Sequence, residues 1–229
     1  MSSGIHKSQF PGRGPFLAPP PEVLRQLEAT RGKKVLEDGD AVAFPQMDLP
    51  GLDLGGEYLA DGMLFETNLS RARLDGAVVR RAFAGGIILR DASCCGTDFY
   101  KAELEGADFS GVLAHGVHFA RAQLTRARFD HGDFWHGDFS DASCSQASFV
   151  GADLSLCNFR DASLGGSDLR GAQFGWADLT GAFLDGETRL AGAIAVEHTA
   201  TMIRFEDEVI EGDAVRALLA SLARQSAGD

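Results

Sequence analysis

The chain lacks the features that mark secreted, disulfide-bonded and membrane-spanning proteins. It has four cysteines in 229 residues and no CxxC pair, so reduced thiols are expected rather than a disulfide framework. No stretch approaches the roughly 18 apolar residues of a membrane span, and residues 1–20 contain no apolar signal core. We therefore expect a cytoplasmic protein that does not associate with membranes.

Basic residues are scarce, with 21 Lys and Arg against 33 Asp and Glu, which gives a formal net charge of −12. Nucleic acids and anionic lipids are themselves negative, so long-range repulsion argues against direct binding to either. The composition favours a basic protein partner.

Catalytic and metal-binding motifs are also missing. The sequence contains no nucleophile elbow, Walker A loop or HExxH motif. His115, His118, His131 and His136 are expected to point outward without converging, whereas a metal ion needs convergent ligands. The sequence therefore predicts no catalytic residues, no cofactor and no metal ion, and favours a protein that is not an enzyme.

What the chain does have is an apolar residue at every fifth position. From Leu49 to Leu184, each residue whose number ends in 4 or 9 is Leu, Phe, Val, Ala or Cys. The residue two places earlier is mostly small, and the other three positions are mostly Asp, Asn, Ser, Arg and Gly. A helix repeats near 3.6 residues and a strand at 2.0, so neither explains a period of five. A short extended piece followed by a tight turn does, and four such pieces close a square in which residues twenty apart stack at about 4.8 Å.

The motif A-[D/N]-[L/F] is complete in "GADFS", "GADLS" and "WADLT", and it resembles the pentapeptide-repeat family. The resemblance covers residues 47–188 and implies an all-β solenoid, a right-handed quadrilateral β-helix. Residues 47–188 would supply about seven coils of twenty residues. Because the large side chains would fill the axis, no internal substrate cavity is expected.

The first coil departs from the pattern. Glu57, Gly62 and Thr67 stand where the small inward residue is expected, and burying an unpaired carboxylate is costly. We expect this coil to be imperfect or open.

Both ends of a solenoid need caps, because each exposes unpaired backbone groups. Residues 1–15 are expected to be a mobile tail. Residues 16–46 are expected to form an N-terminal cap with a helix that starts at Pro21 and carries Val23, Leu24 and Leu27 on one face. Residues 189–229 form a C-terminal extension, with a second helix from Asp213 onward.

The second helix carries an apolar stripe at helical spacing: Val215, Leu218, Leu219 and Leu222. The stripe has two interpretations, which are pairing with a second copy about a twofold axis and docking on the chain's own last coil. Similarity to the quinolone-resistance members of the family implies a homodimer through this helix.

Acidic charge concentrates toward the C-terminal end of the repeat. Residues 47–128 contain 11 acids and 9 bases, whereas residues 129–188 contain 10 acids and 2 bases. The partner-binding acidic residues expected on the outer surface are Asp98, Asp133, Asp138, Asp141, Asp153, Asp161 and Asp178.

Resemblance to the Qnr and MfpA type implies that these acids imitate DNA. The expected partner is DNA gyrase or topoisomerase IV, which the protein would modulate or protect from fluoroquinolones or natural poisons. DNA-binding grooves gain affinity by neutralising phosphate charge, and rows of carboxylates would present similar charge.

Three other interpretations stay open. Asp or Asn before the inward residue can simply hydrogen-bond the turn backbone.

The protein can also be a rigid scaffold unrelated to topoisomerases. A third and weaker alternative is an enzyme that uses His118 between Asp98 and Asp138. The scaffold would use an apolar surface near Arg71, Arg73, Arg80 and Arg81, formed by Met63, Phe65, Val78, Phe83 and Ile88.

Overall fold

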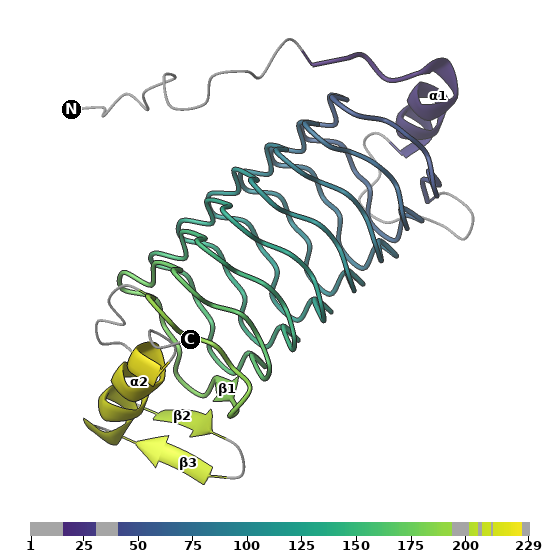
Figure 1. Cartoon of the computed structure of the whole chain (residues 1–229). Coiled ribbons are helices and arrows are strands. Elements are labelled where there is room, and N and C mark those ends of the chain that lie inside the picture. The colour runs from purple at the N-terminus through teal and green to yellow at the C-terminus, as the bar shows by residue number, and fades with distance from the viewer. Residues whose placement is uncertain (1–15, 31–40, 194–201, 206–207, 212, 226–229) are drawn as a thin grey trace, which may run out of the picture.

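The protein is a rod of stacked coils with a small capping structure at each end (Figure 1). The computed structural model describes residues 16–30, 41–193, 202–205, 208–211 and 213–225. The tail predicted at residues 1–15 lies outside the described residues, as does the 31–40 part of the predicted N-terminal cap.

The coils repeat every twenty residues. Parallel bridges join residues twenty apart from Ala43↔Met63 to Ser163↔Phe183, so the predicted stacking is confirmed. Each coil donates backbone hydrogen bonds to the next. Leu54 N–H, for example, donates to the Arg73 carbonyl at 2.7 Å.

Tight turns separate the four sides of each coil. In a representative turn, Ala72 N–H donates to the Leu69 carbonyl at 3.0 Å, and Arg71 has a φ of 60°. A positive φ at the third residue is typical of a type II turn, which favours glycine there. The repeat therefore imposes a left-handed backbone conformation on one residue in five.

The interior is packed with the large residues of the repeat. Two columns of phenylalanine lie on opposite sides of the axis, Phe109, Phe129 and Phe149 in one and Phe99, Phe119, Phe139 and Phe159 in the other. Rings within a column stack with centroids 4.6–5.2 Å apart, and the columns meet edge to face, as between Phe109 and Phe119 at 84°. Both geometries are favourable for aromatic pairs.

The expectation of an imperfect first coil is wrong. All four of its sides bridge the next coil, at Ala43↔Met63, Asp48↔Asn68, Asp53↔Arg73 and Tyr58↔Val78. Thr67 is fully buried, but its hydroxyl donates to the Phe44 carbonyl, and Glu57 is only half-buried. The inward register also begins earlier than residue 47, because Phe44 is buried in the core.

Helix α1 (Pro21–Thr30) covers the first coil. Val23 and Leu27 are buried in the core, and the Ala43 N–H donates to Gln26 Oε1 at 2.7 Å. Leu17 pairs with the open edge beside Leu52, donating to the Gly51 carbonyl at 2.7 Å. These contacts satisfy backbone groups that the end of the solenoid would otherwise expose.

The register shifts by one residue after Leu184. Asp168 bridges Arg189, twenty-one positions on, and Leu190 takes the buried position. The extra residue lies in the turn that follows Leu184, where Asp185 Oδ1 accepts hydrogen bonds from the N–H groups of Gly166 and Thr188 at 2.8 and 3.0 Å. The period of five therefore ends at a local insertion that one carboxylate stabilises.

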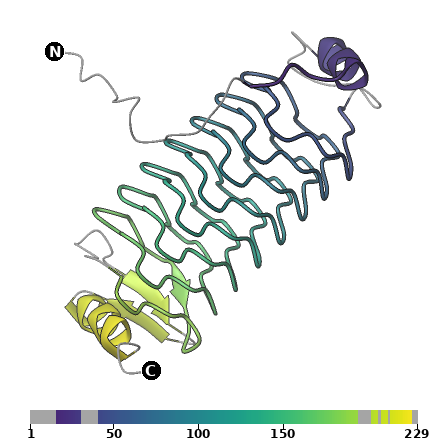
Figure 2. The same ribbon diagram turned by 45° about the horizontal axis from the view of Figure 1, so that its top comes forward.

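A three-stranded sheet and a helix close the C-terminal end (Figure 2). Strand β2 (Met202–Phe205) pairs parallel to β1 (Phe183–Leu184), and β3 (Glu208–Glu211) pairs antiparallel to β2. Helix α2 (Asp213–Gln225) packs beside β3.

The apolar stripe of α2 faces the chain's own core. Val215 and Leu219 are 1% and 4% exposed, and Leu218 is partly buried. The side chain of Leu222 lies outside the described part of the chain. This packing matches the docked-helix interpretation, and the homodimer stays a prediction.

Candidate protein-binding surface

The repeat places the predicted acidic residues on two adjoining sides of the rod and the corner that follows them. Asp133 and Asp153 bridge each other on the first side, and Asp138 and Asp178 each bridge Asn158 on the second. Asp98 lies on the second side two coils before Asp138, because both bridge His118. Asp141 and Asp161 lie on the corner that follows the second side. Together these seven residues form one surface, which we call the acidic face.

The side carboxylates of the acidic face hold the turns in place. Asp98 accepts a hydrogen bond from Tyr100 N–H at 3.0 Å, Asp138 from Ser140 N–H at 3.0 Å, and Asp178 from Thr180 N–H at 2.9 Å. In the same way, Asp133 accepts a hydrogen bond from Trp135 N–H and Asp153 accepts one from Ser155 N–H. The interpretation that these acids bond the turn backbone is therefore confirmed.

His118 lies between two carboxylates on the second side of the acidic face. Its Nδ1 is 3.3 Å from Asp98 Oδ1, and its Nε2 is 3.2 Å from Asp138 Oδ2. Arg80 also pairs with Asp98, and Asn158 Nδ2 donates to Asp138 at 3.1 Å. Both ring nitrogens therefore contact carboxylates, one on the coil before His118 and one on the coil after it.

Several other acids of this surface are paired. His115 Nε2 is 2.7 Å from Asp133, Arg121 is 3.2 Å from Asp141, and Arg160 is 3.1 Å from Asp178. Among the described residues, Asp153 and Asp161 have no cationic partner. Exposed ion pairs contribute only about 0–1 kcal/mol, so a basic partner protein can compete for the paired carboxylates.

Asp178 is held in its ionised form. Burial raises the pKa of this carboxyl, but hydrogen bonds from Thr180 and Arg160 outweigh that effect, so its pKa lies below the ordinary value. The carboxylate keeps its negative charge at neutral pH.

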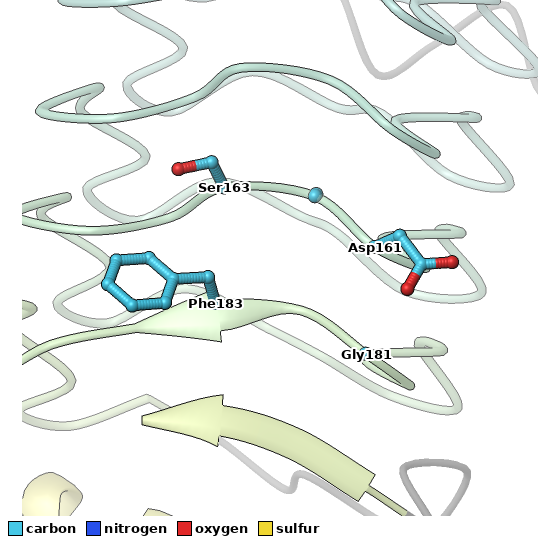
Figure 3. A pocket seen from close by; sticks show the side chains of 5 residues that line it. Asp161, Ser163, Gly181 and Phe183 are labelled. Carbon is cyan, nitrogen blue, oxygen red and sulfur yellow. The ribbon is translucent and has the colours of Figure 1, made fainter. Parts of the chain in front are cut away.

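Asp161 lies at the edge of a shallow pocket of ≈ 270 Å³ (Figure 3). The other lining residues are Ala162, Ser163, Gly181 and Phe183. A Cβ on Gly181 would be 2.1 Å from Asp161 Oδ1, so the glycine leaves room for this carboxylate beside the next coil.

The predicted apolar scaffold surface is divided among separate sides of the rod. Met63, Phe65 and Phe83 are exposed together, beside a shallow pocket of ≈ 390 Å³ lined by Phe65, Phe83 and Glu103 among others. Val78 and Ile88 are half-buried and belong to two other bridge columns. The expectation of one continuous patch is wrong, because residues five apart lie on successive sides.

Among the described residues, no three His, Cys, Asp or Glu side chains are grouped so as to hold a metal ion. In the same part of the chain, no helix has the length and apolar character needed to cross a bilayer. All four cysteines are described, and none of them forms a disulfide.

One group of large apolar side chains points outward and is not part of the core. Trp135, Leu156 and Trp176 are exposed on the corner between the two acidic sides. For Leu156 and Trp176, the signal in the sequence is the turn position itself, which is glycine in the early coils at Gly56, Gly76, Gly96 and Gly116.

Comparison with known proteins agrees with the fold. The family model of pentapeptide repeats matches residues 84–113, 106–134, 138–174 and 157–186. A comparison with curated protein sequences found no match.

Several solved structures are similar at low identity. HetL, a pentapeptide repeat protein involved in heterocyst differentiation regulation from the cyanobacterium Nostoc sp. strain PCC 7120, is 22% identical. The TM-score is 0.47, and the alignment covers 75% of this chain and 88% of that chain. A trypsin-treated variant of QnrB1, a plasmid-mediated fluoroquinolone resistance protein, is 17% identical with a TM-score of 0.45, covering 82% and 98%. Rfr23 from the cyanobacterium Cyanothece 51142 is 18% identical with a TM-score of 0.27, covering 73% and 96%.

The period of five, the coils stacked twenty residues apart and the matched repeats lead to one conclusion. This chain is a pentapeptide repeat protein.

Proposed function

We propose that this protein imitates a DNA duplex and binds in the DNA groove of a type II topoisomerase, DNA gyrase or topoisomerase IV. Binding would modulate the enzyme or protect it from fluoroquinolones or natural topoisomerase poisons. The observation that carries the proposal is the charge of residues 129–188, which have 10 acids and 2 bases.

The linear charge density of this segment is close to that of DNA. Residues 129–188 form three coils, which extend about 14 Å at strand spacing. Duplex DNA has one negative charge per 1.7 Å or so of axis, and hence about eight over that length. The segment has a formal net charge of −8 with neutral histidines. A groove that binds phosphates would therefore meet a similar charge per unit length.

Ion pairs reduce this charge locally. Arg121 reaches from the preceding coil to Asp141, and Arg128 pairs with Asp130 two residues further along the chain. Asp153 and Asp161 have no such partner among the described residues. Within the acidic face, these two carboxylates are therefore the acids that a basic groove would gain most from contacting.

A supercoiling assay with and without a fluoroquinolone tests the proposal. We expect the protein to change gyrase activity or its inhibition by the drug, and the Asp153→Asn/Asp161→Asn variant to be at least tenfold less potent. The absence of any effect at tens of micromolar wild-type protein would contradict the proposal.

The early coils supply a matched control, Asp48→Asn/Asp91→Asn. Asp91 has the same turn conformation as Asp161, with φ of 56° against 57°, and it also lies over a glycine of the next coil, Gly111. Both variants lose two negative charges. Equal losses of potency would show that total charge matters and that the C-terminal half has no special role.

The homodimer belongs to this proposal, because two rods joined at α2 would double the length of the mimic. Val215 and Leu219 are covered by their own chain, so such a dimer needs either another surface of α2 or a different position of the helix. Sedimentation equilibrium decides between a dimer and a monomer with a docked helix.

A scaffold unrelated to topoisomerases is the second candidate. The exposure of Met63, Phe65 and Phe83 on one side favours it, since grouped apolar side chains often mark interfaces. Phe65→Ser/Phe83→Ser separates the two functions. If the protein is a DNA mimic, the variant should keep the effect of the wild type on gyrase. If it is a scaffold that binds through this side, neither the wild type nor the variant should affect gyrase.

A further inference from the structure

Both tryptophans of the chain are exposed on one corner of the rod. Trp135 is 46% exposed, Leu156 41% and Trp176 62%. With His136 these residues form what we call the tryptophan corner. It runs between the side that carries Asp133 and Asp153 and the side that carries Asp138 and Asp178.

The residues of the tryptophan corner are continuous across three coils. His136 N–H donates to the Ser155 carbonyl at 3.0 Å, and Leu156 N–H donates to the Gly175 carbonyl at 2.7 Å. The Trp135 and His136 rings lie 5.7 Å apart. Because neighbouring coils are about 4.8 Å apart, the backbone places these side chains next to one another along the rod.

The backbone at this corner does not suit bulky side chains. His136, Leu156 and Trp176 each have a φ of 60°, in the left-handed region that disfavours residues with a Cβ. The equivalent positions of the preceding coils are all glycine, at Gly56, Gly76, Gly96 and Gly116.

Burial within the chain does not explain the tryptophan corner. Leu156 and Trp176 are exposed apolar side chains in an unfavourable conformation, so they add little to folding. Exposed tryptophans that are grouped with other apolar residues are typical of the energetic centres of protein interfaces.

We propose that the tryptophan corner is a docking site for a basic amphipathic segment of a partner protein. Apolar side chains of the segment would cover Trp135, Leu156 and Trp176. Its lysines or arginines would pair with the flanking carboxylates, above all with Asp153, which has no cationic partner among the described residues.

Charge selects this occupant over a second copy of the chain. Pairing two copies along the corner would bring two acidic surfaces together, and like charges across an interface are unfavourable. A partner segment that has a row of apolar side chains flanked by positive charges would complement both the apolar side chains and the flanking carboxylates of the tryptophan corner. The inference does not depend on the identity of the proposed topoisomerase partner.

Intrinsic fluorescence tests the site directly, because the only two tryptophans of the chain belong to it. The probes are two synthetic amphipathic helices, one of leucine and lysine and one of leucine and glutamate with the same pattern. We expect the lysine peptide to shift tryptophan emission to the blue and protect it from acrylamide quenching, and the glutamate peptide to have no effect.

Glycine substitutions remove the side chains and keep the fold. Leu156→Gly/Trp176→Gly restores the residue that the earlier coils have at this corner, so thermal stability should not fall, and the lysine peptide should bind at least tenfold more weakly. Asp153→Asn should weaken binding severalfold. Phe83→Ser, on a different side of the rod, is the control and should bind like wild type.

Three results would overturn the proposal. One is no change of emission with the lysine peptide, and another is an equal change with the glutamate peptide. The third is a blue shift that appears without peptide as protein concentration rises, which would make a second copy the occupant. Failure of the gyrase assay alone would leave this site untouched.

Discussion

A Cβ atom on Gly132 would lie 2.5 Å from Cε2 of Phe134. The Phe134 ring cannot move aside easily, because Phe129 and Phe139 pack against it with centroids 5.3 and 6.0 Å away. We therefore expect Gly132→Ala to lower the free energy of unfolding by about 1–3 kcal/mol through overpacking. Denaturant titration measures this loss.

Two variants separate this clash from a backbone effect. Phe134→Leu in the Gly132→Ala background should recover part of the stability. The next coil already has this combination, with Ala152 and Leu154 twenty positions after Gly132 and Phe134. Gly116→Ala meets no atom within 4 Å but has a φ of 62°, so it should cost about 1–2 kcal/mol from the backbone alone. Wild-type stability of Gly132→Ala would contradict the packing described above.

Two inward hydroxyl groups have opposite predicted effects. Thr97 Oγ1 donates to the Leu74 carbonyl at 2.7 Å in the core, and Ala77 N–H donates to the same carbonyl at 2.8 Å. Thr97→Val should therefore cost about 1 kcal/mol by removing one of these two hydrogen bonds. Within the described residues Ser167 Oγ is buried and makes no hydrogen bond. Ser167→Ala should keep or raise stability, because alanine occupies the same position at Ala147. Thermal unfolding of both variants checks the contrast, and a destabilised Ser167→Ala would mean that the hydroxyl does have a partner.

The ion pair between Asp53 and Arg73 predicts a pH dependence. Two hydrogen bonds of 2.8 Å from Arg73 lower the pKa of the Asp53 carboxyl in the folded protein. The stabilisation is therefore complete above the pKa of the unfolded chain and is lost as pH falls through the folded value. Because the pair is partly exposed, the effect should stay below about 1 kcal/mol.

Carbon NMR titration of the Asp53 carboxyl measures its pKa, and Arg73→Gln should return it toward the ordinary aspartate value. An unchanged titration in that variant would show that Arg73 does not control this group.

The cysteines should differ in reactivity. Burial raises the pKa of the Cys144 and Cys157 thiols, so little thiolate forms and alkylation should require unfolding. Cys95 is half-buried and should react first in the native protein. Mass spectrometry after brief iodoacetamide treatment identifies the modified residue, and early labelling of Cys144 would indicate that the coil opens there.

Leu219 tests the role of α2. Its side chain is buried against the core of its own chain, so Leu219→Ala should lower stability by about 2–5 kcal/mol in the part of the protein near α2. Hydrogen exchange of β2 and β3 should speed up equally at low and high protein concentration. If the change depends on concentration and the sedimentation mass halves, the helix serves a dimer instead.

The spacing of inward residues was enough to predict the stacked coils. Leu164, Leu169, Phe174 and Leu179 are all buried in one core, because a period of five allows each side of the square only one large inward side chain. A repeating chain contacts mainly its own neighbouring coils, so local pattern and global fold coincide. The bond from each aspartate to the turn that follows it is equally local and was predictable.

Contacts between coils were harder to foresee. The pairing of Asp141 with Arg121 and of Asp178 with Arg160 depends on which of several nearby side chains reaches the carboxylate. The extra residue after Leu184 also changes the register without any break in composition.

The sequence alone determined that this protein is a square coil with a phenylalanine core and an acidic C-terminal half, because a short repeat dictates which side chains point inward. Only the tertiary structure decided which carboxylates keep an uncompensated charge, where α2 rests, and that Trp135, Leu156 and Trp176 share one corner. Those outcomes depend on side-chain reach and on the turn conformation at each corner, and the order of inward and outward residues specifies neither.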